Sequence, residues 1–407
     1  MALSGDARNP IEPGRTAEVT FAGSGFSLAG LLIPGYLLML PTLGVFRFWQ
    51  LTAKRRYYWS RTFIDGDALE YTGNAVQLLI GFLLALVVFI PTAGIYFWIG
   101  TLDQDPQYAG YLIVAAVLYF LAGYAEYRAR RFRFTRTLWR GLRFSQSGSA
   151  WAYAVRRLLW SIGVLATAGL AYPFMRIDLF RYAWNNTQYG DRSFRFTGKW
   201  HLLIGAVLPV ALLFAVLSAA GVFVAIESGV DWNRPSNAEL TIVAGAAFIL
   251  LTLTFLFGRA RVTSRLYSAV EIGNAGLSVR VSAARLVGQA ILYAILLTVA
   301  GFLALLLIGI ASKTIEARAA GLDHTDISAI LSIGWWQLGA LGLGYLAILG
   351  VLSLLGEAIL ALGFWKAVAR GTRINNADDL LSVRRGKAEE SAVIGEGLAD
   401  ALNVGAY

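Results

Sequence analysis

Long apolar blocks alternate with shorter polar stretches along the whole chain. Eight blocks stand out, at residues 26–46, 75–100, 108–126, 158–175, 201–226, 238–258, 286–311 and 333–364. A helix needs roughly 20 apolar residues to cross the hydrocarbon core of a bilayer. Six blocks meet that length or nearly do, whereas 26–46 and 158–175 are interrupted by glycine and proline. The pattern predicts an all-α, polytopic transmembrane helical bundle.

Composition supports a membrane protein and excludes most soluble classes. Hydrophobic residues make up 57% of the 407 positions and charged residues only 15%, against about 25% charged residues in ordinary soluble domains. The chain has no cysteine, so disulfides, thiolate nucleophiles and cysteine metal sites are excluded. The first twenty residues are polar and lack a basic segment before an apolar run, so we expect no cleaved signal peptide.

The positive charges predict which side of the membrane each connection faces. The formal net charge is +10, and basic residues gather in five stretches: 47–61, 127–157, 176–200, 259–285 and the tail after 365. Connections 101–107, 227–237 and 312–332 are poor in basic residues or rich in acidic ones. The positive-inside rule therefore predicts five cytoplasmic stretches. We expect a multi-pass protein of the bacterial inner membrane with both termini in the cytoplasm.

This charge distribution conflicts with eight ordinary spans. Block 158–175 has basic stretches on both sides, so a full crossing would move one of them outside. We predict instead six full spans and two re-entrant or interfacial segments, 26–46 and 158–175. Such broken segments must be packed within protein, because irregular backbone is not tolerated against lipid. Eight spans with a local violation of the rule remain the alternative, and external labelling of a cysteine at position 188 would favour it.

An internal repeat is visible at a constant offset of 125 residues. Thr42 and Gly44 match Thr167 and Gly169, and a second group of matches follows. That group pairs Arg56, Tyr57, Trp59, Tyr71, Thr72 and Gly73 with Arg181, Tyr182, Trp184, Phe196, Thr197 and Gly198. The repeat divides the chain into a polar tail (1–20), repeat 1 (21–126), a basic connection (127–157), repeat 2 (158–258), a third hairpin region (259–365) and a cytoplasmic tail (366–407).

Several of these motifs resemble the YjgN-like family of bacterial inner-membrane proteins. The resemblance rests on Thr42-Leu43-Gly44, Arg56-Tyr57-Tyr58-Trp59, Glu70-Tyr71-Thr72-Gly73 and Trp139-Arg140-Gly141. It covers most of residues 20–285 and implies a polytopic inner-membrane protein. It implies no activity, because the family has no established function. One departure is Phe82, where the family often has a basic residue after the preceding glycine.

The basic connection contains the first candidate binding residues. Arg133, Arg136, Arg140 and Arg143 recur at i, i+3, i+7 and i+10, which places them on one face of a helix. A basic helix lying in the membrane interface attracts anionic headgroups. The alternative interpretation is that these residues only anchor the topology.

The repeated Arg-Tyr-x-Trp motif contains the second set of candidates. The residues are Arg56, Tyr57 and Trp59 in one copy, and Arg181, Tyr182 and Trp184 in the other. Guanidinium groups fork to phosphate or carboxylate and stack on aromatic rings. The two copies could form an anion or lipid site, or belong to an aromatic belt at the interface.

Glu357 is the clearest ionisable residue inside an apolar block. An acid at membrane depth is costly and often functional. The two hypotheses are a proton- or cation-coupling role and an ion pair with an arginine of the basic stretches.

The sequence nominates no particular chemistry. It contains no zinc-protease, nucleophile-elbow, P-loop or dinucleotide motif, so we expect no enzyme activity, no cofactor and no metal site. The first functional hypothesis is a transporter or channel-like protein for a small or amphiphilic anion. The alternative is a non-transporting scaffold that binds anionic lipids on the cytoplasmic face. We expect no nucleic-acid partner. A polar cavity between the repeats would favour transport, and a packed interface with a basic inner surface would favour lipid binding.

Overall fold

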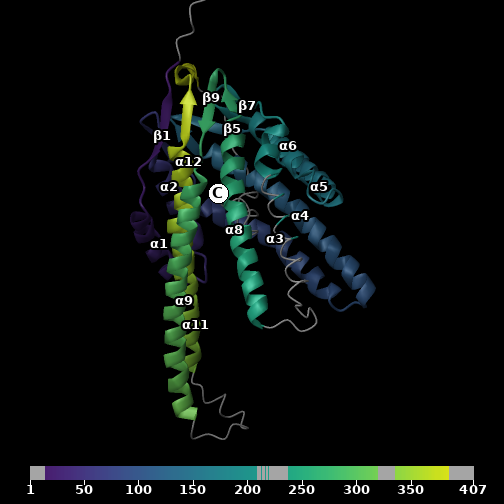
Figure 1. The fold of residues 1–407 in the computed structure, drawn as a ribbon, viewed down its shortest axis with the longest axis vertical. Helices are drawn as coiled ribbons and strands as arrows, with labels where there is room; N and C mark the ends of the chain where they lie inside the picture. The colour runs from purple at the N-terminus through teal and green to yellow at the C-terminus, as the bar shows by residue number, and fades with distance from the viewer. Residues whose placement is uncertain are drawn as a thin grey trace, which may run out of the picture. The chain divides into compact units, whose positions relative to one another are not determined.

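The computed structural model describes residues 14–208, 237–319 and 335–384, together with 212, 216 and 219. Most of these residues are helical, as predicted (Figure 1). The α-helices are α1 (Gly25–Met39), α2 (Arg47–Ser60), α3 (Ala75–Ile99), α4 (Gln104–Thr135), α5 (Ala150–Ala166), α6 (Tyr172–Asn185), α8 (Asn237–Tyr267), α9 (Ala283–Ala319), α11 (Trp335–Leu355) and α12 (Leu362–Arg370). A π-helix, η1 (Gly356–Ala361), joins α11 to α12, and a 3₁₀-helix, η2 (Ala377–Ser382), lies near the end.

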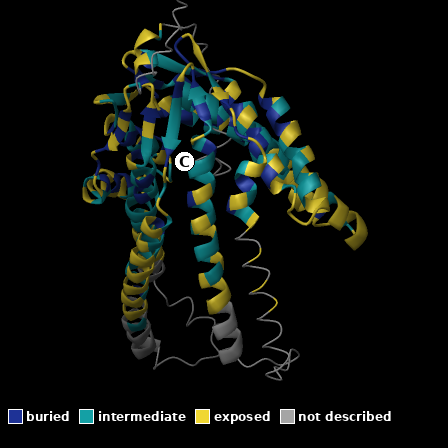
Figure 2. Cartoon of the chain, turned by 45° about the horizontal axis from the view of Figure 1, so that its top comes forward, coloured by how far each residue is buried: buried dark blue, intermediate teal, exposed yellow. Residues whose placement is uncertain are grey.

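Five helical segments in the described part of the chain are long and apolar enough to cross a membrane. They are Ala75–Ile99, Gln104–Thr135, Gly245–Tyr267, Ala283–Leu306 and Gly342–Arg370. These segments correspond to five of the six predicted spans and support the membrane class. The sixth, block 201–226, lies largely outside the described residues. Most residues of the five segments have little burial within the chain, and Figure 2 shows the exposed positions along the helices.

Blocks 26–46 and 158–175 are interrupted by the same kind of turn. The Thr42 hydroxyl donates to the carbonyl of Leu38 at 2.6 Å and accepts the N–H of Phe46 at 3.2 Å. Thr167 makes the matching bonds 125 residues later, at 2.8 Å and 3.0 Å. The residue after each threonine has φ of 49°, and the glycine that follows also has positive φ. Each block is therefore broken by a turn between two helices, α1 and α2 or α5 and α6, and is not one continuous helix.

Ten short strands form a closed ring. The prediction of an all-α fold does not include these strands and is wrong in that respect, although most described residues are helical. The strands are β1 (Ala17–Phe21), β2 (Thr62–Ile64), β3 (Asp67–Tyr71), β4 (Thr137–Trp139), β5 (Leu142–Gln146), β6 (Thr187–Tyr189), β7 (Arg192–Phe196), β8 (Val270–Ile272), β9 (Ala275–Val279) and β10 (Thr372–Asn375). Each pairs antiparallel with its neighbours in sequence, and β1 pairs with β10 to close the ring.

Four of the strand pairs are hairpins with two-residue turns. Asp65-Gly66 and Arg140-Gly141 have positive φ at both turn positions, which is the geometry of a type I′ turn. In the other two turns, Gly190 and Gly273 take positive φ at the first position. Such turns match the right-handed twist of the flanking strands, so a two-residue connection suffices.

The same junction recurs five times around the ring and fixes the helices to it. In each junction, the backbone N–H of the residue after an odd-numbered strand donates to a backbone carbonyl. That carbonyl belongs to the residue just before the next even-numbered strand. The five bonds are Ala22 to Arg61, Thr72 to Arg136, Ser147 to Asn186, Thr197 to Ala269 and Arg280 to Gly371, at 2.8–2.9 Å. Four even-numbered strands begin with a threonine whose hydroxyl donates to the carbonyl four residues earlier, in the preceding helix. The 125-residue offset relates the first and third hairpins of this series.

Aromatic side chains gather on one face of the ring. The ring of Tyr189, in β6, lies 4.7 Å from that of Phe144 in the adjacent β5. It also lies 5.3 Å from the ring of Trp139 in β4, although β5 separates β4 from β6. Side chains from alternate strands converge in this way on the concave face of a closed sheet. The Tyr189 hydroxyl donates to the carbonyl of Trp139 at 3.1 Å, and burial raises the pKa of Tyr189 to about 12. This part of the ring is therefore filled by side chains.

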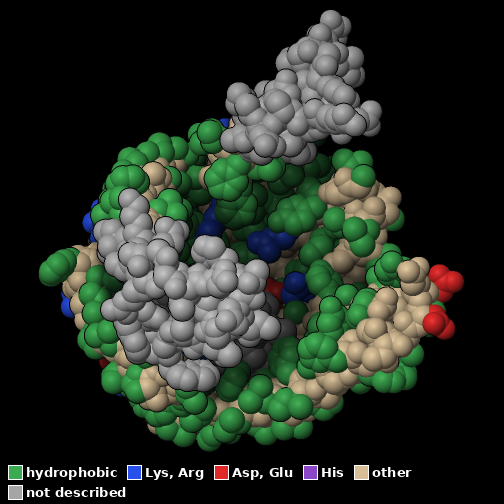
Figure 3. Space-filling view, turned by 90° about the horizontal axis from the view of Figure 1, so that it is seen from below, with side chains coloured by type: hydrophobic (Ala, Val, Ile, Leu, Met, Phe, Trp, Pro, Cys, Tyr) green, Lys and Arg blue, Asp and Glu red, His purple; other side chains and the backbone are tan. Residues whose placement is uncertain are grey.

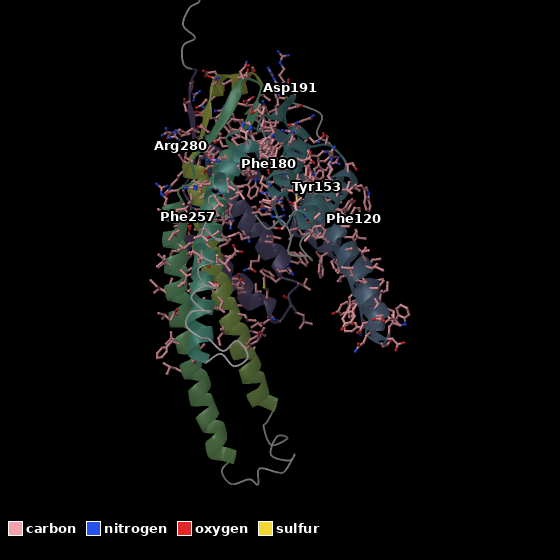
Figure 4. All side chains as sticks on the ribbon, turned by 45° about the vertical axis from the view of Figure 1, so that its right-hand side comes forward. Phe120, Tyr153, Phe180, Asp191, Phe257 and Arg280 are labelled. Carbon is pink, nitrogen blue, oxygen red and sulfur yellow. The ribbon has the colours of Figure 1, made fainter. Side chains whose placement is uncertain are left out.

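Residues 376–384, which we call the C-terminal strap, cross the tips of two hairpins. The Asp379 carboxylate accepts the N–H of Asn274 at 2.9 Å. Asp191 and Arg384 exchange two hydrogen bonds, at 2.9 Å and 3.0 Å. Leu380 is buried within the strap. Figure 4 shows Asp191 at the tip end of the strands.

The chain divides into two compact units. The first comprises residues 1–22, 48–283 and 368–407 and contains the ring, and the second comprises residues 23–47 and 284–367. In the second unit α1 packs against α11 and η1, and the hydroxyls of Tyr36 and Ser353 lie 2.7 Å apart.

Candidate anion site

The predicted interfacial helix over the four arginines of residues 127–157 is wrong. Helix α4 ends at Thr135, so Arg133 is helical, Arg136 is its C-cap, Arg140 lies in a turn and Arg143 lies in β5. The buried residues of β4 alternate with period two, and Arg140-Gly141 supplies a two-residue turn. Spacing of i, i+3, i+7 and i+10 therefore does not put these side chains on one helical face.

Two of these arginines have structural partners within the ring. The Arg140 guanidinium pairs with Asp67 at 2.5 Å and with Asp65 at 2.9 Å, which joins two neighbouring hairpins. Burial alone would lower the pKa of Arg140, but hydrogen bonds to the two carboxylates outweigh it and raise the pKa. Arg143 donates to the carbonyl of Thr135 at 2.9 Å, at the end of α4.

The other two members of the predicted set lie at the end of α4. The Arg136 guanidinium lies over the Phe132 ring, 5.4 Å from its centroid. The Arg133 carbonyl accepts the Thr137 hydroxyl at 2.8 Å. An anion-binding role for either residue remains a prediction.

The repeated arginines hold the backbone of their own repeats. Arg56 donates to the carbonyl of Gly73 at 3.2 Å, and Arg181 donates to the carbonyl of Gly198 at 2.7 Å. The two bonds are equivalent. Each links a helix, α2 or α6, to the glycine just after the hairpin that follows that helix. They favour a structural role for both arginines, although neither bond tests anion binding.

The aromatic residues of the repeated motif also make defined contacts. The Trp59 indole N–H donates to the Thr137 hydroxyl at 2.8 Å, and the Arg61 guanidinium lies 4.7 Å from the centroid of the Tyr57 ring. The Tyr182 hydroxyl bonds both the N–H and the carbonyl of Ser149. Trp184 differs, because its buried indole N–H has no hydrogen-bond partner among the described residues.

Trp184 lies beside Arg130, an arginine of α4 outside the predicted set. The Arg130 guanidinium is 4.9 Å from the centroid of the Trp184 ring and 5.3 Å from that of Phe134. The Arg130 Nε is buried and has no hydrogen-bond partner in the described part of the chain. The nearby carboxylate of Glu126 is engaged by Arg157 at 2.7 Å and by Tyr153 at 3.1 Å. Figure 4 shows Tyr153 and Phe180 at the ring-side ends of α5 and α6.

Gln146 is the last residue of β5. Its Nε2 donates to the carbonyl of Ala183 at 3.3 Å, which fixes the orientation of the amide. Its Oε1 is buried without a hydrogen-bond partner among the described residues. The Tyr127 hydroxyl donates to the carbonyl of Ser147, the residue after Gln146. We call Arg130 and Trp184 the Arg130 site.

The Arg130 site has the donors that an anion requires. Burying a guanidinium is costly unless a counter-charge or hydrogen bonds compensate it, and an unsatisfied buried donor adds roughly 1–3 kcal/mol. Arg55 lies seven residues before β2, just as Arg130 lies seven residues before β4. Arg55 is buried, and its guanidinium donates to the Tyr71 hydroxyl at 3.0 Å.

Glu357 lies in the π-helix η1, within the candidate span Gly342–Arg370. It is close enough to Tyr36 for an electrostatic interaction. π-Helical turns inside α-helices are rare and are frequent at functional sites. The coupling role of Glu357 remains a prediction. Within the described residues, no group of three or more His, Cys, Asp or Glu could hold a metal ion.

Five apolar segments of membrane-spanning length, together with a ring of antiparallel strands, are consistent with a mainly helical membrane protein. The chain belongs to a bacterial protein family of unknown function, DUF898, whose family model matches residues 16–401. This assignment confirms the predicted YjgN-like family, which corresponds to DUF898. No curated protein and no solved structure matches the chain significantly.

Proposed function

We propose that this protein binds an anionic amphiphile, such as an anionic membrane lipid, at the Arg130 site. The observation that carries the proposal is the Arg130 guanidinium: within the described residues its buried Nε has no hydrogen-bond partner, and it stacks on Trp184, whose indole N–H also lacks one. Charge-assisted hydrogen bonds to phosphate or carboxylate are roughly twice as strong as neutral ones. A bound anion would therefore satisfy groups that are otherwise costly to bury.

The length of α4 suits a ligand with an apolar tail. Arg130 lies near the ring-side end of the helix, and the other end carries exposed apolar residues such as Leu112 and Val117. Thirteen residues separate Val117 from Arg130, or about 20 Å of helix. Hydrophobic side chains also make up much of the surface in Figure 3. A headgroup at Arg130 would leave its acyl chain beside an apolar helix surface.

The ring favours lipid binding over transport as the function. Trp139, Phe144 and Tyr189 pack against one another on its concave face. Packed aromatic rings leave little space for a polar path through that part of the ring. We therefore place the lipid-binding role ahead of the transporter hypothesis, and we propose no enzymatic activity.

The proposed orientation places the ring and both termini in the cytoplasm of a bacterial cell, with the two broken segments re-entrant. A cysteine at Gln188, in β6, is expected to react with a membrane-impermeant thiol reagent only from the cytoplasmic side. The control is a cysteine at Thr101, between α3 and α4, which is expected to react from outside. External labelling at position 188 would contradict the orientation.

The lipid-binding proposal is tested by Arg130→Gln in the full-length protein. Purified wild-type protein, exchanged into mixed micelles, is expected to prefer a phosphatidylglycerol over a phosphatidylcholine of the same chains. Losing a charge-assisted hydrogen bond of about 1.5–3 kcal/mol corresponds to roughly a 10- to 150-fold weaker affinity for the anionic lipid. Lipid binding is measured by native mass spectrometry.

The control is Arg195→Gln, which removes the same charge from an exposed position in β7. It is expected to retain the anionic preference. Thermal unfolding without added lipid checks that Arg130→Gln is folded. An unchanged preference in folded Arg130→Gln protein would exclude the Arg130 site as the lipid site.

A further inference from the structure

The turn between α5 and α6 is apolar and exposed. All residues from 165 to 170 are exposed, and Leu165 and Leu170 are 81% and 78% exposed. Turns in water are rich in Asn, Asp and Ser as well as Gly and Pro, whereas Thr167 has the only polar side chain in this stretch. The surface of the turn therefore suits apolar surroundings better than water.

The backbone N–H groups of this turn are satisfied within the hairpin. The N–H groups of residues 167–170 and 172 donate to backbone carbonyls at 2.7–3.2 Å, and that of Ala171 donates to the Thr167 hydroxyl at 3.0 Å. The same hydroxyl donates to the carbonyl of Gly163 at 2.8 Å. Irregular backbone is excluded from hydrocarbon because its polar groups lack partners. That obstacle is removed for every N–H of this turn, and unpaired N–H groups are tolerated less well than under-satisfied carbonyls.

The charged residues of the hairpin indicate how deep it can reach. Residues 158–175 contain no charged side chain, and arginines end this run on both helices, Arg157 on α5 and Arg176 on α6. Thr167 lies ten positions after Arg157, which corresponds to about 15 Å of helix. The hydrocarbon core is about 30 Å thick, so this length covers one leaflet and not two.

The base of the hairpin suits the headgroup region. Arg156 pairs with Asp178 at 3.3 Å, and its side chain is still 47% exposed. The Trp160 indole N–H donates to the same carboxylate at 3.0 Å. Tryptophan is enriched at the headgroup level, and arginine is attracted to anionic headgroups. The polar base and the apolar turn therefore match two successive layers of a bilayer.

We infer that the α5–α6 hairpin enters one leaflet of the bilayer, with its turn among the acyl chains and the arginines of its base at the phosphates. This placement differs from the expected packing of the segment within protein, because the turn contacts lipid directly. It rests on the proposed re-entrant course of the segment and not on the Arg130 site.

Spin labels at single cysteines test this placement, and the chain has no native cysteine that would also be labelled. The full-length variants are Leu170→Cys at the turn, Trp151→Cys at the start of α5, and the control Val87→Cys in the middle of the candidate span Ala75–Ile99. In vesicles of phosphatidylcholine and phosphatidylglycerol, collisions with oxygen report hydrocarbon and collisions with a water-soluble nickel chelate report water. The Leu170 label is expected within about 5 Å of the depth of the Val87 label, and the Trp151 label is expected closer to water.

Two results would overturn the inference. Frequent collisions of the Leu170 label with the nickel chelate would mean that the turn lies in water, either because the segment crosses the bilayer or because it never enters. Shielding from both reagents would mean that the turn packs within protein or against a second copy of the chain. Leu165→Cys repeats the measurement if Leu170→Cys fails to fold. Failure of the Arg130 site is a separate result, because Arg130→Gln is expected to leave all these collision rates unchanged.

Discussion

Replacing Leu78 by alanine is expected to lower the free energy of unfolding by about 2–5 kcal/mol, the range for a buried leucine that leaves a cavity. Leu78 is 0% exposed and belongs to a cluster with Phe48, Ala75 and Phe132. This cluster packs α2, α3 and the end of α4 together near the ring. Denaturant unfolding in detergent micelles, followed by tryptophan fluorescence, measures the loss.

The matched control is Leu83→Ala, because the same change occurs on the same helix at a side chain that is 52% exposed. An exposed leucine leaves no cavity, so a change within about 0.5 kcal/mol is expected. Equal losses for the two variants would mean that the cluster around Leu78 does not pack α3 as described.

The second large effect is expected at Gly190, in the β6–β7 turn. Its φ is +56°, and an added Cβ would lie 2.3 Å from the carbonyl oxygen of Arg384 in the C-terminal strap. Gly190→Ala is therefore expected to displace the strap as well as strain the turn. Since overpacking costs about 1–3 kcal/mol, trypsin should cleave after Arg384 about 5- to 150-fold faster.

Gly66→Ala separates strain from steric overlap. Gly66 also has positive φ, at +85°, but nothing lies within 4 Å of the position of its Cβ. This variant is expected to lose about 1–2 kcal/mol from backbone strain without faster cleavage after Arg384. Similar cleavage rates in both variants would show that the contact between Gly190 and Arg384 does not hold the strap.

The membrane class and the broken segments could be predicted from local sequence. Long apolar runs identify candidate spans because the bilayer core sets their length. Thr42 and Thr167 match in sequence and make the same turn in the structure. The apolar runs and the two turns are set by residues close together in sequence. The hydrophobic pattern and the residue spacing were therefore sufficient to predict them.

The ring could not be predicted in the same way. Its strands have only three to five residues. The pairing of β1 with β10 joins strands from near the start and near the end of the described chain. The turns Asp65-Gly66 and Arg140-Gly141 were nevertheless local signals of hairpins. The basic residues around Arg140 also fitted a helical period, and the hairpin pattern was overlooked.

The candidate site was predicted only in part. Trp184 was a predicted residue and lies in the Arg130 site, whereas Arg56, Arg181 and Arg140 have backbone or carboxylate partners. Arg130 was missed because sequence shows its charge but not that its Nε is buried without a hydrogen-bond partner among the described residues. Those properties depend on α6, which folds back beside α4 and places Trp184 against the guanidinium.

The most direct test of lipid binding is an experimental density map of the full-length protein in phosphatidylglycerol nanodiscs. We predict density for a lipid phosphate at hydrogen-bond distance from the Arg130 guanidinium and the Trp184 indole N–H, and no such density in Arg130→Gln. A map in which a carboxylate of the chain itself pairs with Arg130, with no lipid density beside it, would contradict the proposed function.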